Sequence, residues 1–84
     1  MRQFRIFWVN EELACVVLEY SGQFAVAALY EGAPSLGEFF QGTLLSSGIC
    51  QLISESNQSP LWLNVEGIDL SNDEIVDLLR QICE

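Results

Sequence analysis

The residues of this chain that could do chemistry are carboxylates and cysteines, because the 84-residue sequence has no His and no Lys. His is the commonest general base of enzymes, Lys is the Schiff-base nucleophile, and a catalytic Cys needs an activating base. The pairs Glu11-Glu12 and Asp73-Glu74 remain, but adjacent side chains point apart on a strand or a helix. We therefore predict that the protein is not an enzyme and has no catalytic residue.

One spacing resembles a metal site. Asp69-x-Ser71-x-Asp73 matches the opening of a calcium-binding EF-hand loop. The match then fails, because Glu74 stands where the loop needs Gly and Arg80 where it needs a bidentate Glu. A turn followed by a helix cap explains the same residues. With no Gly-rich phosphate motif either, we predict neither a metal site nor a cofactor.

The three cysteines, Cys15, Cys50 and Cys83, are odd in number and widely spaced within apolar surroundings. That spacing fits neither a disulfide framework nor a CxxC metal pair, so we expect small core side chains in a reducing cytoplasm. The N-terminal apolar run is too short for a signal peptide. Glu19 interrupts the best candidate for a membrane-spanning helix, so we predict a cytoplasmic protein.

The charge balance narrows the choice of partner. Twelve acids against three Arg give a net charge of −9, of which residues 1–54 carry −3 and residues 55–84 carry −6. This field repels nucleic acid and anionic membranes, whose recognition depends on Lys and Arg. It favours a basic protein partner. We predict that the partner-binding residues are acids of the C-terminal third, namely Glu66, Asp69, Asp73, Asp77 and Glu84.

The elements that would carry these acids begin with an apolar stretch, residues 4–30, which two polar interruptions cut into three runs. We predict an antiparallel meander, with Phe4, Ile6 and Trp8 on one face of its first strand. The middle run, residues 11–20, also fits a short helix; the hairpin signal at Ser21-Gly22 favours a strand. The small Ala residues of the third run indicate a face that a helix approaches closely.

Later segments supply two helices and one or two strands. Ser35-x-x-Glu38 matches a capping box and predicts a helix over residues 36–46. Residues 49–53 form a short apolar run that could be a strand, and residues 61–65 alternate as a strand does. Ser71 and Glu74 form a second capping box before an amphipathic helix. Trp8 and Trp62 are interpreted as core residues.

These elements predict one α+β domain over residues 1–84. It has an antiparallel sheet of three to five strands with two helices on one face, in the order β-β-β-α-(β)-β-α. Its predicted function is that of a small acidic protein-binding module that inhibits or regulates a basic partner. In the sharpest form the carboxylates imitate DNA phosphates, as phage-encoded antagonists of host proteins do.

Three other functions remain open. Half of the residues are hydrophobic, so the chain could be an obligate assembly subunit or homodimer whose acidity serves solubility. Such a subunit would pair through Phe7, Val9 and an exposed strand edge. An antitoxin-like regulatory module has a similar order of elements, although no motif supports it. The third is a small ligand-binding domain, although no residue pattern points to a ligand.

Overall fold

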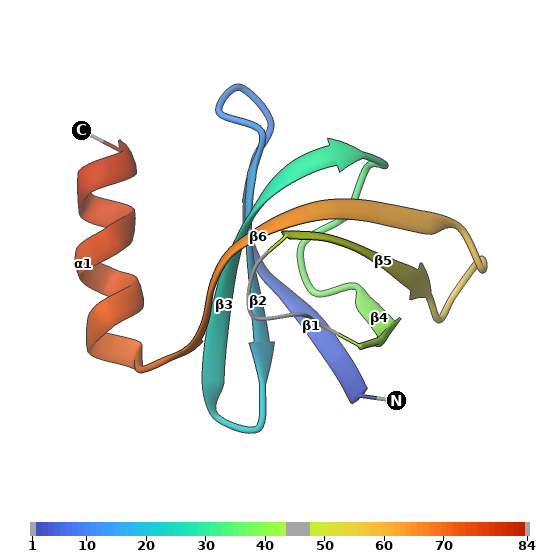
Figure 1. Cartoon of the computed structure of the whole chain (residues 1–84), viewed down its shortest axis with the longest axis horizontal. Helices are drawn as coiled ribbons and strands as arrows, with labels where there is room; N and C mark the ends of the chain where they lie inside the picture. The colour runs from blue at the N-terminus through green and yellow to red at the C-terminus, as the bar shows by residue number, and fades with distance from the viewer. Residues whose placement is uncertain (1, 44–47, 84) are drawn as a thin grey trace.

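The protein folds as a closed barrel of six antiparallel strands with a helix packed on its outside (Figure 1). The structure is a computed structural model that describes residues 2–43 and 48–83. Around the barrel the strands follow the order β1-β2-β3-β6-β5-β4, and β4 pairs with β1 to close it. The elements are β1 (Arg2–Asn10), β2 (Cys15–Tyr20), β3 (Gln23–Glu31), β4 (Phe39–Gly42), β5 (Gly48–Ser54), β6 (Pro60–Leu70) and α1 (Asn72–Cys83).

The predicted α+β class is therefore wrong. The described residues form a six-stranded barrel with one helix, in place of an open sheet with two helices on one face. Each strand has hydrogen-bonded neighbours on both sides, so the exposed strand edge expected of an assembly subunit is absent from the described strands. The similarity to antitoxin-like modules rested on the order of elements alone and is lost with that order.

The N-terminal meander is confirmed, and its middle run is a strand. β2 pairs with β1 on one side and with β3 on the other, from Cys15↔Ala28 to Tyr20↔Gln23. The predicted faces of β1 are wrong beyond Ile6, because a register shift between Ile6 and Trp8 reverses the alternation. Phe4 and Ile6 point into the barrel, whereas Trp8 packs against the outer apolar cluster beneath α1.

The helix predicted over residues 36–46 is also wrong. Residues 39–42 form β4, and residues 44–47 lie outside the described part of the chain. The two reciprocal bonds between Ser35 and Glu38 close a turn instead: the Ser35 N–H donates to Glu38 Oε1 at 3.0 Å, and the Glu38 N–H donates to the Ser35 carbonyl at 3.0 Å. Phe40 then enters the core while Phe39 stays exposed, which is the alternation of a strand.

Apolar side chains fill the barrel, as the narrow interior of a small barrel requires. The fully buried ones come from five strands and include Phe4, Ile6, Val16, Leu18, Ala25, Ala27, Leu52, Leu61 and Leu63. The Ala residues of β3 were expected to face a helix, and this is wrong for Ala25 and Ala27, which point inward. Cys50 is buried in the same core, as predicted. The strands expected over residues 49–53 and 61–65 are confirmed as parts of β5 and β6.

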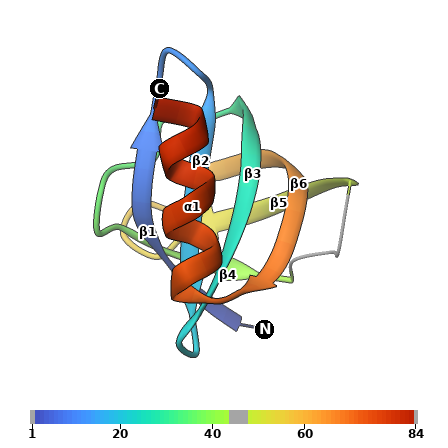
Figure 2. The ribbon, with the colours of Figure 1, turned by 90° about the vertical axis from the view of Figure 1, so that its left-hand side faces the viewer.

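A second apolar cluster lies outside the barrel and docks α1, which crosses in front of β1, β2 and β3 in Figure 2. Ile75 is fully buried against outward side chains of β2 and β3, which are Cys15, Val17, Phe24 and Val26. Burying a side chain of this size stabilises the docked helix by about 1.5–3 kcal/mol.

The predicted C-terminal helix is thus confirmed, as is its capping box, in which Ser71 and Glu74 exchange two hydrogen bonds of 3.2 Å. The side chain of Cys83, the third cysteine expected in apolar surroundings, lies outside the described part.

Candidate functional site

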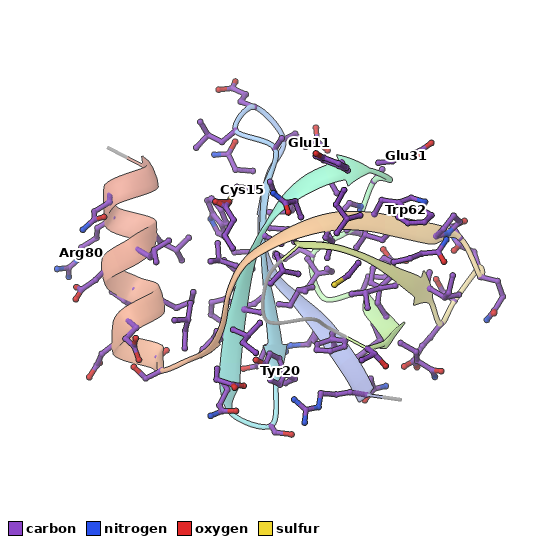
Figure 3. The ribbon with its side chains drawn as sticks, viewed as in Figure 1. Glu11, Cys15, Tyr20, Glu31, Trp62 and Arg80 are labelled. Carbon is purple, nitrogen blue, oxygen red and sulfur yellow. The ribbon has the colours of Figure 1, made fainter. Side chains whose placement is uncertain are left out.

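The carboxylates of the described residues lie on the outside of the barrel and of α1, mostly without a cationic neighbour. Within residues 2–43 and 48–83 the structure holds one ion pair, between Arg5 and Glu19, with 2.7 Å between nitrogen and oxygen. The Arg2 guanidinium lies over the Tyr20 ring, 5.0 Å from its centre. Arg80 is exposed on α1 (Figure 3). The outer surface is therefore acidic, with little local compensation.

Two of the predicted partner-binding acids lie together on the helix. Asp73 and Asp77 are exposed on α1 and are four residues apart, so they share one side with a rise of about 6 Å between their Cα atoms. Asp73 also lies in the first turn, where the helix dipole favours negative charge. Glu84, expected on the same face, lies outside the described part of the chain.

Asp69 is hydrogen-bonded within the fold through both its backbone N–H and its carboxylate. Its backbone has φ = +56°, and its N–H donates to the Tyr20 hydroxyl at 2.7 Å while that hydroxyl donates to its Oδ1 at 2.9 Å. These bonds anchor the turn that leads from β6 into α1. Burial is the main cause that raises the pKa of Tyr20, so the phenol stays neutral at physiological pH. Asp69 therefore positions the helix, and its carboxylate is only partly available to a partner.

Glu66 lies on the outer side of β6 and lines a surface hollow of about 350 Å³. The other lining residues come from the β1–β2 turn, the start of β2 and β3, and they are Leu13, Ala14, Cys15 and Ala28. A backbone bond from the Leu29 N–H to the Ala14 carbonyl, at 2.7 Å, holds this turn beside β3. The hollow combines one carboxylate with apolar walls.

Beside this hollow, β3, β5 and β6 expose large apolar side chains that the sequence analysis did not select. Trp62 was interpreted as a core residue, and this is wrong, because its side chain points outward and is 37% exposed. Tyr30 and Ile49 are 64% and 51% exposed. A signal was present in the sequence: Trp62 alternates in phase with Asn64 and Glu66, opposite the apolar set of the same strand.

A different apolar group surrounds Arg5 on the outer side of β1. Leu36 and Phe7 line one hollow with Arg5, and Phe39 lines the next one, also with Arg5. Leu36 is 70% exposed. Phe7 also contacts Phe24 edge to face, with 4.9 Å between the ring centres. This apolar group therefore lies on the side of the barrel where Arg5 pairs with Glu19.

A hollow of about 300 Å³ contains a serine hydroxyl bonded to a carboxylate, the two groups that a nucleophile and its general base require. The buried Ser54 hydroxyl donates to Glu38 Oε2 at 2.7 Å, and the Ser35 N–H donates to the other carboxylate oxygen. The first of these bonds is the main cause that lowers the pKa of Glu38. Its hydrogen-bond donors thus hold the carboxylate in its ionised form and lower its basicity, whereas a general base is helped by a raised pKa.

The described residues contain no group of three metal-ligating side chains that could hold a metal ion. In the segment that resembles an EF-hand opening, Asp69 ends β6, Ser71 caps α1 and Asp73 lies in the first helical turn. No helix among the described residues is long and apolar enough to cross a membrane.

Comparisons of the chain with protein-family models, with curated proteins and with solved structures gave no match, so no relative or structural neighbour indicates a function.

Proposed function

We propose that this protein is a small cytoplasmic, non-catalytic module that binds a basic protein partner and thereby inhibits or regulates it. The observation that carries the proposal is the uncompensated acidity of the surface. A chain with a net charge of −9 has, within its described residues, a single ion pair. Glu66, Asp73 and Asp77 present exposed carboxylates to such a partner, and Asp69 contributes its remaining oxygen.

The physical consequence of this surface is electrostatic steering. A one-signed field raises the association rate with an oppositely charged protein by about 10–1,000-fold, and salt reduces this gain steeply. The same field repels nucleic acid and a second copy of the chain. In its sharper form, the α1 carboxylates Asp73 and Asp77 stand in for phosphates in a nucleic-acid groove of the partner.

The test is affinity capture from the source cell with the immobilised protein, followed by identification of the captured proteins. At about 50 mM salt we expect a basic protein to be retained and at about 0.5 M salt to be released, because the Debye length falls several-fold. The variant that tests the acids themselves is the double substitution Asp73→Asn, Asp77→Asn, which keeps the shape of the helix and removes two charges. Retention that ignores both salt and this variant would contradict the proposal. Displacement by duplex DNA would support the phosphate-mimic form.

The alternative function, an assembly subunit, is favoured by a specific observation as well. Leu36, Phe39 and Phe7 are 70%, 43% and 36% exposed around Arg5, which is paired with Glu19. A homodimer through these residues would show twice the monomer mass in light scattering at micromolar concentration, and Leu36→Ser would return it to a monomer. A stable monomer would exclude the homodimer.

A further inference from the structure

Besides the group around Arg5, α1 leaves uncovered a face of the barrel formed by the outer sides of β3, β6 and β5. We call it the Trp62 face. It consists of Ala28, Tyr30, Glu31, Ile49, Gln51, Trp62, Asn64 and Glu66. In Figure 1, β5 and the part of β6 that carries Trp62 lie on the side of the barrel away from the helix.

The strand register makes these residues neighbours. Trp62 lies opposite Glu31 of β3 and Gln51 of β5, so its indole stands between the two (Figure 3 shows Glu31 and Trp62). One step along β6, Asn64 lies between Ala28 and Ile49 in the same way. From Trp62 to Glu66 the outward positions span about 13 Å at 3.3 Å per residue.

The face is apolar in the middle and carries a carboxylate at each end. Tyr30, Ile49 and Trp62 supply the apolar area, while the exposed Glu31 lies opposite Trp62 in the strand pairing. At the other end Glu66 borders the hollow with Leu13 and Ala28. An apolar centre with aromatic side chains and a charged rim is the composition of protein-binding surfaces.

Charge decides which occupant fits. β3, β5 and β6 contain no Arg or Lys, so a second copy of this chain would place Glu31 and Glu66 against each other without a countercharge. Nucleic acid and anionic lipid meet the same repulsion. An Arg guanidinium satisfies both elements of the face, because it stacks on an indole or phenol ring and bonds a carboxylate in a bidentate manner.

We propose that the Trp62 face binds a segment of a protein partner that carries Arg next to an apolar side chain. The guanidinium stacks on Trp62 and bonds Glu31, and the apolar side chain enters the hollow beside Glu66. The segment binds through side chains, because both edges of β6 are already paired within the barrel. This inference rests on the proposed function and assigns its specificity to a surface other than the α1 acids.

The test uses synthetic peptides of alternating Arg and Leu, with Lys-Leu and Glu-Leu peptides of the same length for comparison. In an NMR titration of the labelled protein, we expect the Arg-Leu peptide to shift Tyr30, Ile49 and the Trp62 indole, and to bind more tightly than the Lys-Leu peptide. The Glu-Leu peptide should not bind. Failure of the Arg-Leu peptide to bind, or shifts confined to α1, would overturn the inference.

Two variants and two matched controls locate the binding. Trp62→Ala should weaken peptide binding about tenfold or more, as loss of a central aromatic anchor does. Phe39→Ala, also an exposed aromatic substitution, should change it less than twofold, or by under about 0.4 kcal/mol. Glu31 is exposed and outside the core, so Glu31→Lys tests the face even if Trp62→Ala destabilises the barrel. Its control is Glu55→Lys, which changes the net charge by the same amount at an acid outside both the Trp62 face and the α1 acids.

The outcomes separate this inference from the proposed function. Salt-sensitive capture of a basic protein that Trp62→Ala and Glu31→Lys leave unchanged would overturn the Trp62 face alone. Loss of capture in these two variants, with Phe39→Ala and Glu55→Lys binding as before, would support it. Absence of any basic partner, together with no binding of the Arg-Leu peptide, would remove both proposals.

Discussion

Replacing Tyr20 by Phe tests whether a single hydroxyl sets the position of α1. The Tyr20 ring is 4% exposed and contacts Phe4 edge to face, with 5.2 Å between ring centres. Its hydroxyl accepts the Asp69 N–H and donates to the Asp69 carboxylate. Asp69 has φ = +56°, a conformation that costs a residue other than Gly about 1–2 kcal/mol. Two residues later, Ser71 caps the helix.

The magnitude follows from the bonds that are lost. Tyr20→Phe keeps the buried ring, so no cavity forms, and both hydrogen bonds to Asp69 disappear. A neutral bond contributes about 0.5–1.5 kcal/mol, and a bond to a charged group contributes more. Because Asp69 is exposed, water replaces part of the second bond, and the expected total loss is about 2 kcal/mol. For a domain of this size, that lowers Tm by about 8–16 °C.

The assay is urea unfolding followed by circular dichroism, combined with amide hydrogen exchange of α1. We expect the helix amides to lose protection before those of the barrel. The companion variant Asp69→Gly loses the carboxylate bond, keeps the N–H bond and relieves the positive φ. It should therefore be less destabilised than Tyr20→Phe. A loss below about 0.5 kcal/mol in Tyr20→Phe, or a larger loss in Asp69→Gly, would refute this account of the turn.

Tyr20→Phe should also differ from the wild type in how its stability changes at alkaline pH. Burial first, among several causes, raises the pKa of Tyr20 in the folded state above its ordinary value of 10.0. A raised folded-state pKa gives stability that is fully present below the unfolded pKa and is lost as pH rises through the folded value. Wild-type protein should therefore lose stability above about pH 10. Tyr20→Phe should lack this part of the alkaline loss.

Three further substitutions test the docking of the helix, the turn before β4 and the contact between the end of β3 and β6. Ile75→Ala should cost about 2–4 kcal/mol in urea unfolding and release α1 from the barrel, visible as faster exchange of its amides. Ser54→Ala removes the main cause of the lowered pKa of Glu38, whose ionised form stabilises the fold above the unfolded pKa. Its stability should therefore fall less than that of the wild type as pH drops from about 5 to about 3. Gly32→Ala places a Cβ 2.8 Å from the Leu61 side chain at φ = +115°, and should lower the free energy of unfolding in urea by at least about 1 kcal/mol.

The sequence was sufficient for every element whose signal is local. The hairpins of the meander and the capped, amphipathic α1 follow from alternation, turn residues and a capping box within a few positions. The barrel was missed because closure depends on β4, which has four residues and pairs with β1 from Arg2↔Gly42 to Arg5↔Phe39. Such distant pairing leaves no local pattern, and the Ser35–Glu38 bonds of a turn look the same in sequence as those of a helix start.

The candidate site divides in the same way. The acidic character of the C-terminal third could be predicted, because charge is read directly from composition. The roles of its members could not: Asp69 is held by Tyr20, which lies 49 residues earlier in the chain. The Trp62 face was missed because Trp62 was assigned to the core of an open sheet with two helices on one face. In a barrel the core is the interior, and the outside of every strand is exposed unless another element covers it. The helix covers only part of that outside.

Because the barrel is closed, charge and shape complementarity are expected to act on different steps of partner binding. With both edges of each strand paired, a partner cannot add a strand and must bind through side chains. Exposed charges at a rim act on the association rate and on its salt dependence, whereas a buried aromatic anchor acts on the dissociation rate. Substitutions of Asp73 and Asp77 should therefore slow association, and Trp62→Ala should speed dissociation. If both kinds of substitution changed only the association rate, the partner would recognise the acidic field alone, and the Trp62 face would have no part in its specificity.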